Sequence, residues 1–437
     1  MESLSPKNSQ ENLTTTDISI SSFDMVASLS TALDLIDPKL INHHKRVCYI
    51  ATSLASFMGF AHDELQKIYL ASILHDIGAI AFEDRLNSVE FEYGGGETHG
   101  ILGAKLLLEF SPFANLAPLV MYHHTWWDHG KGKLSLDQKV PYTSHLIHLA
   151  DRIAILVNDQ QPILSQISEI EKDIIGQSDK MFSSEFVSVF LKISKKNTFW
   201  LDLASPNIGW ILGRKFSFLQ TMLGLDDLSD WSRFFAVIID TRSRFTATHS
   251  SGVAATAQKL ASLFNFSALD CKKMEIAGHL HDIGKLAVPN SILEKSGQLN
   301  TKEWRVVHAH SYYTHSILDQ ITGFEEITRW ASNHHETLDG RGYPFGHSGE
   351  ELCIGSRIMM VADIFTALAE DRPYRKGLNE QKIQNVFFEC IQKNKLDPLV
   401  TEALLDNYEI MNCIRIGAQV KEAQRLQKFW ETATSHN

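Results

Sequence analysis

The sequence HDIGK at residues 281–285 has a near copy, HDIGA, at residues 75–79 of the 437-residue chain. The chain also carries 20 histidines, which prompts a search for a wider internal repeat around these two stretches. Ligand-type residues recur in the same order and at nearly constant separation: His43 with His249, His75-Asp76 with His281-Asp282, His99 with His310, His123-His124 with His334-His335, and Asp151 with Asp363. This order predicts a duplicated domain with small loop insertions.

Apolar residues near the repeated positions recur at intervals of three and four, as one buried face of a helix requires. The faces consist of Val253, Ala257, Leu260, Ala261 and Phe264 after His249, and of Val47, Ile50, Leu54 and Phe57 after His43. Few stretches alternate like strands. We therefore expect an all-α fold of two tandem helical bundles, with a flexible N-terminal segment (1–18), a first domain (19–215) and a second domain (216–437).

Composition excludes several classes of protein. Hydrophobic residues make up 44% and charged residues 21% of the chain, which is typical of globular proteins. The net charge of −11 argues against a nucleic-acid polymer as partner. The five cysteines form no CxxC pair, and neither a secretory leader nor an apolar run long enough to span a membrane is evident. A cytoplasmic protein is the prediction.

Five imidazoles and two carboxylates in each half form a mixed nitrogen and oxygen set, which suits iron, manganese or zinc better than calcium. Seven ligands exceed one tetrahedral site. Two metals about 4 Å apart and bridged by a carboxylate would use this number and leave positions for a water and a phosphate. Asp282 is the candidate bridge in the second half. A single histidine is more often a structural residue, but the same ordered set found twice favours ligands.

The second half resembles the HD-GYP family of the HD phosphohydrolase superfamily. The matching blocks are His281 to Lys285, His334 to Pro344 (HHETLDGRGYP), Val361-Ala362-Asp363 and Arg372-Pro373-Tyr374-Arg375, within residues 241–376. The resemblance implies a helical HD fold and a metal-dependent phosphodiesterase. Its substrate would be a bacterial cyclic dinucleotide, 3′,3′-cyclic GMP-AMP or cyclic di-GMP, and its product a linear 5′-phosphorylated dinucleotide.

The same resemblance assigns roles to residues. The metal ligands would be His249, His281, Asp282, His310, His334, His335 and Asp363, holding two divalent ions, iron or manganese. Asp282 and Lys285 would be catalytic, Arg372 and Arg375 would contact phosphate, and Tyr343 would contact substrate from its loop. Family members with a third metal carry a Glu where this chain has Phe245, so two metals are expected. Thr366 also departs from many relatives, which have an acidic residue there.

The first half resembles the broader HD superfamily and could form a second metal site from His43, His75, Asp76, His99, His123, His124 and Asp151. It has Ala79 in place of Lys285, and residues 126–132 (WWDHGKG) replace the GYP loop. A cation and the substrate loop are thus expected to be missing. This half could be a regulatory or dimerising module, a hydrolase of phosphomonoesters or nucleotides, or a silent relic. The tandem arrangement resembles that of phosphodiesterases acting on the mixed guanine-adenine cyclic dinucleotide.

Three other interpretations of the whole chain stay open. HD-type ligand sets also serve di-iron oxygenases, which oxygen consumption would reveal. A mononucleotide or deoxynucleotide phosphohydrolase would be distinguished by its products. A cyclic-dinucleotide-sensing module with structural metals would bind without turnover, and a homodimer is compatible with any of these.

Overall fold

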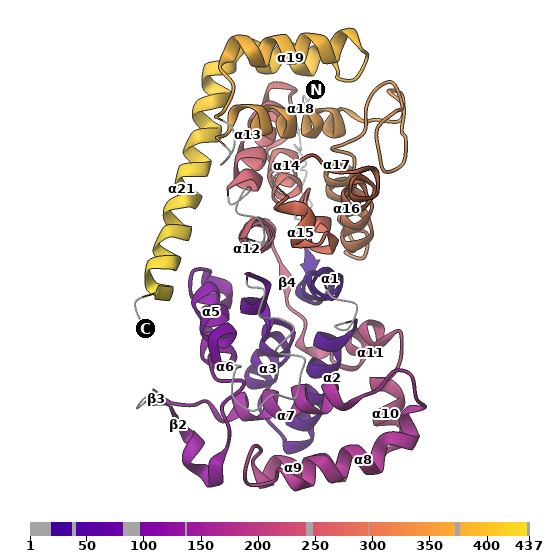
Figure 1. Cartoon of the computed structure of the whole chain (residues 1–437), viewed down its shortest axis with the longest axis vertical. Coiled ribbons are helices and arrows are strands. Elements are labelled where there is room, and N and C mark those ends of the chain that lie inside the picture. Colours follow the sequence, from indigo (N-terminus) through magenta and orange to yellow (C-terminus); the bar gives the residue numbers. More distant parts are fainter. Residues whose placement is uncertain are drawn as a thin grey trace, which may run out of the picture.

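The computed structural model describes residues 19–36, 41–81, 97–135, 138–241, 248–295, 297–371 and 376–434. Within these ranges the protein is built almost entirely of helices, and its two sheets have two short strands each (Figure 1). The all-α expectation is therefore confirmed. The predicted flexible segment 1–18 lies outside the described residues, and the expected boundary near residue 215 stays a prediction. No helix of the described ranges combines the length and the apolar character that a membrane span needs.

The first half contains one strand pair of its own and a series of α and 3-10 (η) helices. The elements before the loop that carries His123 and His124 are α1 (Ser22–Asp34), α2 (His43–Met58), α3 (His62–Leu74), η2 (Ile77–Ala81), α5 (Glu97–Leu108), η3 (Ser111–Leu116) and α6 (Ala117–Met121). Those after it are η4 (Asp128–Lys133), β2 (Leu134–Ser135), β3 (Gln138–Lys139), α7 (Tyr142–Leu156), α8 (Ile163–Gly176), α9 (Ser184–Ile193), α10 (Asn197–Leu203) and α11 (Ile208–Lys215).

The second half repeats the order of the first around its own ligands. Its elements are η5 (Ser217–Leu219), β4 (Met222–Leu223), α12 (Leu225–Thr241), α13 (His249–Leu263), α14 (Ala268–Leu280), η6 (Ile283–Ala287), α15 (Asn290–Leu293), α16 (Thr301–Leu318), α17 (Glu325–Ser332), α18 (Ile354–Ala369), α19 (Glu380–Gln392), α20 (Pro398–Asp406) and α21 (Tyr408–Thr434). Helix α2 packs on α3 and α7, and in the same way α13 packs on α14 and α18. The internal repeat seen in the sequence is thus a structural repeat.

Helix starts in the second half follow ordinary capping chemistry. The side chain of Asn300 accepts hydrogen bonds from Lys302 N and Glu303 N, and Glu303 in turn accepts one from Asn300 N. This reciprocal cap satisfies backbone donors at the start of α16, the helix that carries His310. Ser267 caps α14 through the amide of Asp270. These caps set where α16 begins and where α14, the helix that leads into His281, begins.

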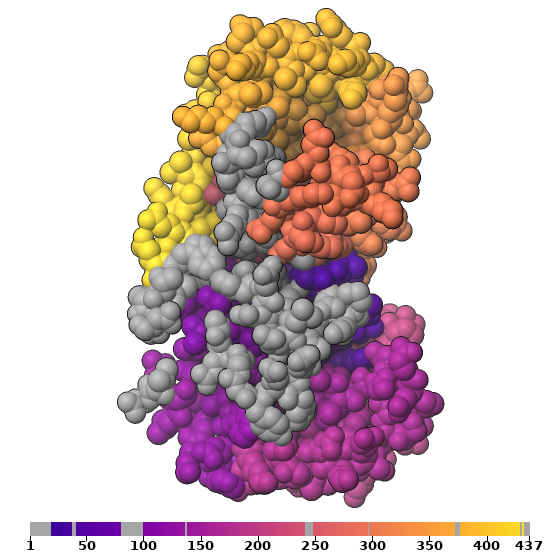
Figure 2. All heavy atoms as spheres, viewed as in Figure 1, coloured from indigo at the N-terminus to yellow at the C-terminus, as the bar shows by residue number. Residues whose placement is uncertain are grey.

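The two halves form two lobes and meet through equivalent elements (Figures 1 and 2). Strand β1 (Ile20–Ser21) pairs antiparallel with β4, and each strand leads into the helix that opens its half, α1 or α12. Helix α1 contacts η6 and α16 of the second half, while α12 contacts η2 and η3 of the first. Helix α21 runs along the second half and ends beside α5 of the first half. The opening helix of each half therefore packs on the segment that follows the His-Asp pair of the other half.

Candidate metal centres

The seven predicted ligands of the second half come from separate elements and converge in one place. His249 begins α13, His281 and Asp282 follow α14, and His310 lies within α16. The remaining three are His334 and His335, which follow α17, and Asp363 on α18. All are buried except His335, which is partly exposed. Helix packing therefore brings together residues that are up to 114 positions apart in the sequence.

The donor atoms fall into two neighbouring groups. In the first group, His249 Nε2 lies 3.1 Å and His281 Nε2 lies 3.9 Å from Asp363 Oδ1. In the second group, His310 Nε2 lies 3.2 Å from His334 Nε2, and His335 contributes a third nitrogen. Within each group the donor atoms lie within 4.8 Å of one another. Each group is thus compact enough for one cation.

Asp282 stands between the two groups and turns one oxygen toward each. Its Oδ2 lies 3.2 Å from His281 Nε2, whereas its Oδ1 lies 3.4 Å from His310 Nε2 and 3.7 Å from His334 Nε2. A carboxylate with its two oxygens divided in this way can ligate two ions at once. This is the arrangement that the bridging role predicted for Asp282 requires.

Backbone carbonyls fix the orientation of three of the rings. In each case Nδ1 lies within hydrogen-bond distance of the carbonyl three residues earlier, so that Nδ1 carries the proton and donates. The contacts are 2.8 Å for His281 to Gly278 O, 2.5 Å for His310 to Val307 O, and 2.6 Å for His334 to Ala331 O. The Nε2 lone pairs are therefore left to face the centre of the cluster.

The cluster fits a divalent cation better than it fits a self-contained hydrogen-bond network. His281 Nε2 and Asp282 Oδ1 are buried and have no hydrogen-bond partner. Buried polar atoms rarely lack partners, and such an atom calls for an explanation such as an ion. Burial, together with neighbouring imidazoles such as His335, holds the pKa of His334 well below its usual range, so this ring stays neutral and able to ligate. The donor set and its unpartnered atoms both point to metal.

The glycine of the HDIG stretch allows the ligands to approach one another. A Cβ on Gly284 would lie 1.9 Å from the carbonyl oxygen of His310, and a Cβ on Gly78 would lie 2.0 Å from that of His99. No side chain fits at such distances. In each half a glycine is thus required for the HD turn to rest directly on the helix that supplies the next histidine.

The other predicted site residues of the second half surround this cluster. Nζ of Lys285 donates to Oδ2 of Asp282. Although burial disfavours its charge, Asp282 raises the pKa of Lys285, so it remains a cation. The ring of Tyr343 stacks on His308 with centroids 4.0 Å apart and lies 4.9 Å from His335. Arg372, Arg375 and Phe245 lie outside the described residues.

A carboxylate that sequence reasoning missed supports the first ligand. Glu370, at the end of α18, has Oε2 within 3.1 Å of His249 Nδ1. The same oxygen accepts a hydrogen bond from Gln419 of α21 at 3.1 Å. Glu370 is one helical turn beyond Thr366, but no pattern in the sequence signals its contact with a residue 121 positions earlier.

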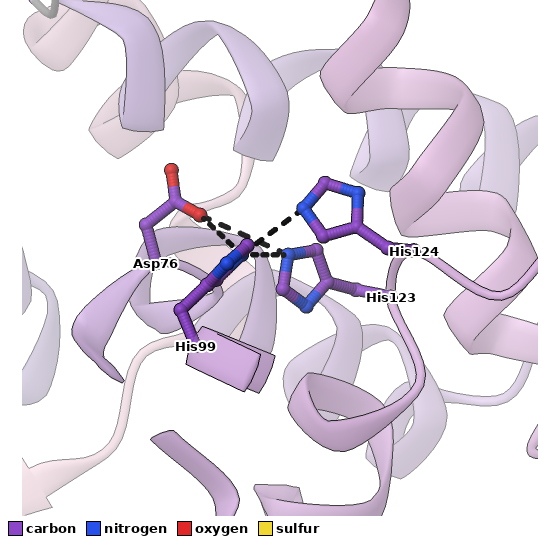
Figure 3. A group of neighbouring side chains, drawn as sticks. All are labelled: Asp76, His99, His123 and His124. Atoms are coloured by element: carbon purple, nitrogen blue, oxygen red, sulfur yellow. Dashed lines mark hydrogen bonds and ion pairs between the residues drawn. The ribbon is translucent and has the colours of Figure 1, made fainter. Parts of the chain in front are cut away.

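The first half forms an equivalent pair of groups. His43 Nε2 lies 3.3 Å from Asp151 Oδ1, and His75 Nε2 lies 3.2 Å from Asp76 Oδ2. Figure 3 shows the second group, in which His99 lies among Asp76, His123 and His124. The distances from His99 Nε2 are 3.4 Å to Asp76 Oδ1, 3.2 Å to His123 Nε2 and 3.0 Å to His124 Nε2. The seven residues predicted for this half also lie together.

A cation reaches the first cluster, contrary to the expectation based on Ala79. Arg152 follows Asp151 on α7, and its Nε lies 3.3 Å from Asp151 Oδ2. Nη2 of the same guanidinium lies 3.2 Å from His124 Nδ1. The expectation was wrong because it considered only the position equivalent to Lys285, whereas a neighbouring helix supplies the charge. His44, next to His43, is a further buried imidazole near this cluster that the comparison of halves did not include.

The fold and the paired clusters define the chain as a tandem HD-domain protein of the metal-dependent phosphohydrolase class. Matches to the HD domain family cover residues 40–156 and 233–398. The chain is 30% identical over 389 residues to 3′3′-cGAMP-specific phosphodiesterase 1 of Vibrio cholerae, covering 87% of this chain and 90% of that protein. It is 28% identical to 3′3′-cGAMP-specific phosphodiesterase 3 of the same organism, and this match covers 87% of this chain and 93% of that protein. The chain belongs to the HD-GYP family of phosphodiesterases.

A solved structure is similar over nearly the whole chain. The crystal structure of a cyclic GMP-AMP specific phosphodiesterase of V. cholerae superimposes with a TM-score of 0.63 at 25% identity. The match covers 90% of this chain and 98% of that one. A cyclic di-GMP phosphodiesterase of Pseudomonas aeruginosa is 36% identical over 144 residues, or 33% of this chain and 35% of that protein. The fold of the V. cholerae structure is thus shared over 90% of this chain, including both of its HD domains.

Proposed function

We propose that this chain is a metal-dependent phosphodiesterase that hydrolyses a bacterial cyclic dinucleotide, 3′,3′-cyclic GMP-AMP or cyclic di-GMP, to a linear 5′-phosphorylated dinucleotide. The observation that carries the proposal is the placement of Asp282 between two groups of ligands. The names of the full-length relatives favour the mixed guanine-adenine dinucleotide. We further propose that the enzyme acts in the cytoplasm and could form a homodimer.

The second half would hold two divalent ions, iron or manganese. His249, His281 and Asp363 surround one group, His310, His334 and His335 surround the other, and Asp282 serves both. Bound there, such ions supply a water activated near neutral pH and positive charge for the phosphate oxygens. The first half would hold additional metal through its own seven residues.

The protein's own groups would position the substrate and stabilise the transition state. Lys285, held as a cation beside Asp282, is placed to stabilise negative charge that develops on the non-bridging phosphate oxygens. Tyr343 has its ring beside His335 and would contact the substrate from its loop. Arg372 and Arg375 offer planar guanidinium forks for the second phosphate. Asp282 and Lys285 are thus the proposed catalytic residues.

A product assay with both cyclic dinucleotides tests the proposal. The wild type would be compared with His281→Ala/Asp282→Ala and with His75→Ala/Asp76→Ala, each metal-loaded and with its folding checked by circular dichroism. We expect the second-half variant to lose turnover of both substrates. Turnover that survived this double substitution would refute the assignment of the second half as catalytic. Phosphomonoester or mononucleotide hydrolysis in place of dinucleotide opening would favour the nucleotide phosphohydrolase alternative.

A further inference from the structure

His44 is a fully buried imidazole beside the ligand cluster of the first half. It is the second residue of α2, and its Nδ1 lies 3.2 Å from Oδ1 of Asp34, the last residue of α1. The other oxygen of Asp34 accepts from Lys45 Nζ at 3.3 Å and from Asn42 N at 3.0 Å. Because Nδ1 of His44 donates to an oxygen of Asp34, the ring proton lies on Nδ1, and Nε2 is a bare acceptor.

This acceptor faces another acceptor across a short gap. His44 Nε2 lies 3.9 Å from Asp76 Oδ2 and has no hydrogen-bond partner. His75 Nε2 and His43 Nε2 lie 3.2 Å and 3.9 Å from the same carboxylate oxygen. At 3.9 Å the two atoms are too far apart for a hydrogen bond, so a proton on Nε2 would not be satisfied by this contact either. A lone pair and a carboxylate oxygen that face each other in a buried site repel unless a cation lies between them.

The second half offers an internal comparison at the equivalent position. Ser250 follows His249 there, and Asp240 takes the place of Asp34. The Ser250 hydroxyl and amide both donate to Asp240, at 2.9 Å and 3.1 Å. Position 250 therefore offers no donor atom to the metal cluster, whereas position 44 adds one.

We infer that His44 is a further metal ligand of the first half, which gives this half eight ligand residues where the second half has seven. The inference rests on the proposal that the first half binds metal. An additional imidazole occupies a coordination position that the second half leaves for water or phosphate. Metal sites whose positions are filled by protein are structural, whereas catalytic sites keep one open. The first half is thus built to retain its ion without turning over substrate.

Metal retention in the full-length chain tests this role. The second cluster is emptied with His281→Ala/Asp282→Ala, so that any bound metal belongs to the first half. Into this background we would introduce His44→Ser, which places at position 44 the serine that the second half has at position 250. The control in the same background is His145→Gln. His145 is also buried on a helix of the first half, but its two ring nitrogens already contact the carbonyl oxygens of Thr125 and Gly132 at 3.0 Å and 3.1 Å.

The readouts are manganese per chain during dialysis against a chelator, and the visible spectrum of the cobalt-substituted protein. We expect His44→Ser to lose manganese at least about tenfold faster than the background and to change the cobalt spectrum, with His145→Gln unchanged in both. Equal retention and an identical spectrum after His44→Ser would refute the role of His44 while leaving metal binding intact. A background protein that binds no metal at all would overturn both the inference and the proposed first-half metal site.

Discussion

Glu370 and His249 form a carboxylate–imidazole pair at the edge of the second cluster, with Oε2 and Nδ1 3.1 Å apart. The other nitrogen of the same ring lies 3.1 Å from Asp363. A carboxylate behind a ligating histidine fixes the ring and raises its basicity. Because Gln419 of α21 also donates to Glu370, the C-terminal helix takes part in this support.

Replacing Glu370 with Gln should weaken metal binding. The neutral amide supports the His249 ring less strongly, and loss of such a partner typically costs about 10- to 100-fold in metal affinity or activity. Metal titration and turnover at saturating metal would measure the two effects separately. Glu389→Gln, an exposed position on α19, is the matched control. Unchanged metal affinity in Glu370→Gln would show that the pair does not support the ligand.

Gly284→Ala should destabilise the second half and disturb its cluster. The added Cβ would meet the carbonyl oxygen of His310, which is backbone and cannot rotate away. Overpacking of this kind typically costs about 1–3 kcal/mol. Thermal unfolding and metal content would both be measured. Gly297→Ala is the control, because nothing lies within 4 Å of its Cβ position. A Gly284→Ala protein with wild-type melting temperature and metal content would contradict this account.

Lys285→Gln should slow catalysis while leaving the metals in place. If the ammonium stabilises charge in the transition state, its loss should lower kcat by about 100-fold with little change in metal stoichiometry. Lys302→Gln, on the exposed first turn of α16, controls for loss of a positive charge. A Lys285→Gln enzyme that lost its metals in proportion to its activity would indicate a role in holding Asp282 and not in catalysis.

The metal-free protein should lose stability as the pH rises from about 4 to about 7. Burial raises the pKa of Asp240 to about 7 from an ordinary value of 3.8. Between these two pH values the folded state keeps a proton that the unfolded chain releases. The contribution of Asp240 to the free energy of unfolding is therefore complete below its ordinary pKa and is lost as the pH rises through its raised pKa. Chelator-treated wild type and Asp240→Asn would be unfolded with urea across this range.

The Asn variant should show a flatter dependence of the free energy of unfolding on pH. Asp230→Asn, on the same helix but more exposed, should follow the wild type. Equal slopes for the wild type and Asp240→Asn would exclude Asp240 as the source of the dependence.

The sequence by itself determined the duplicated all-α architecture and the residues that gather in each half. Helical periodicity is a local property, so it can be read from neighbouring residues, and the repeated order of His43 to Asp151 and His249 to Asp363 needs no knowledge of packing. The sequence also shows the glycine of the HDIG stretch in both halves, but it does not show why a glycine is needed there. Only the structure shows that Gly284 rests on the backbone of His310.

Tertiary structure alone decided how these residues divide into two groups and what supports them. The two oxygens of Asp282 face different histidines because Asp282 follows α14, a helix that packs on both α13 and α17. Glu370, Arg152 and His44 reach their clusters through packing between helices, and no sequence pattern marks a polar residue for such a contact. Contacts between distant segments depend on how helices pack in three dimensions, whereas a sequence pattern reports only the face that each helix buries.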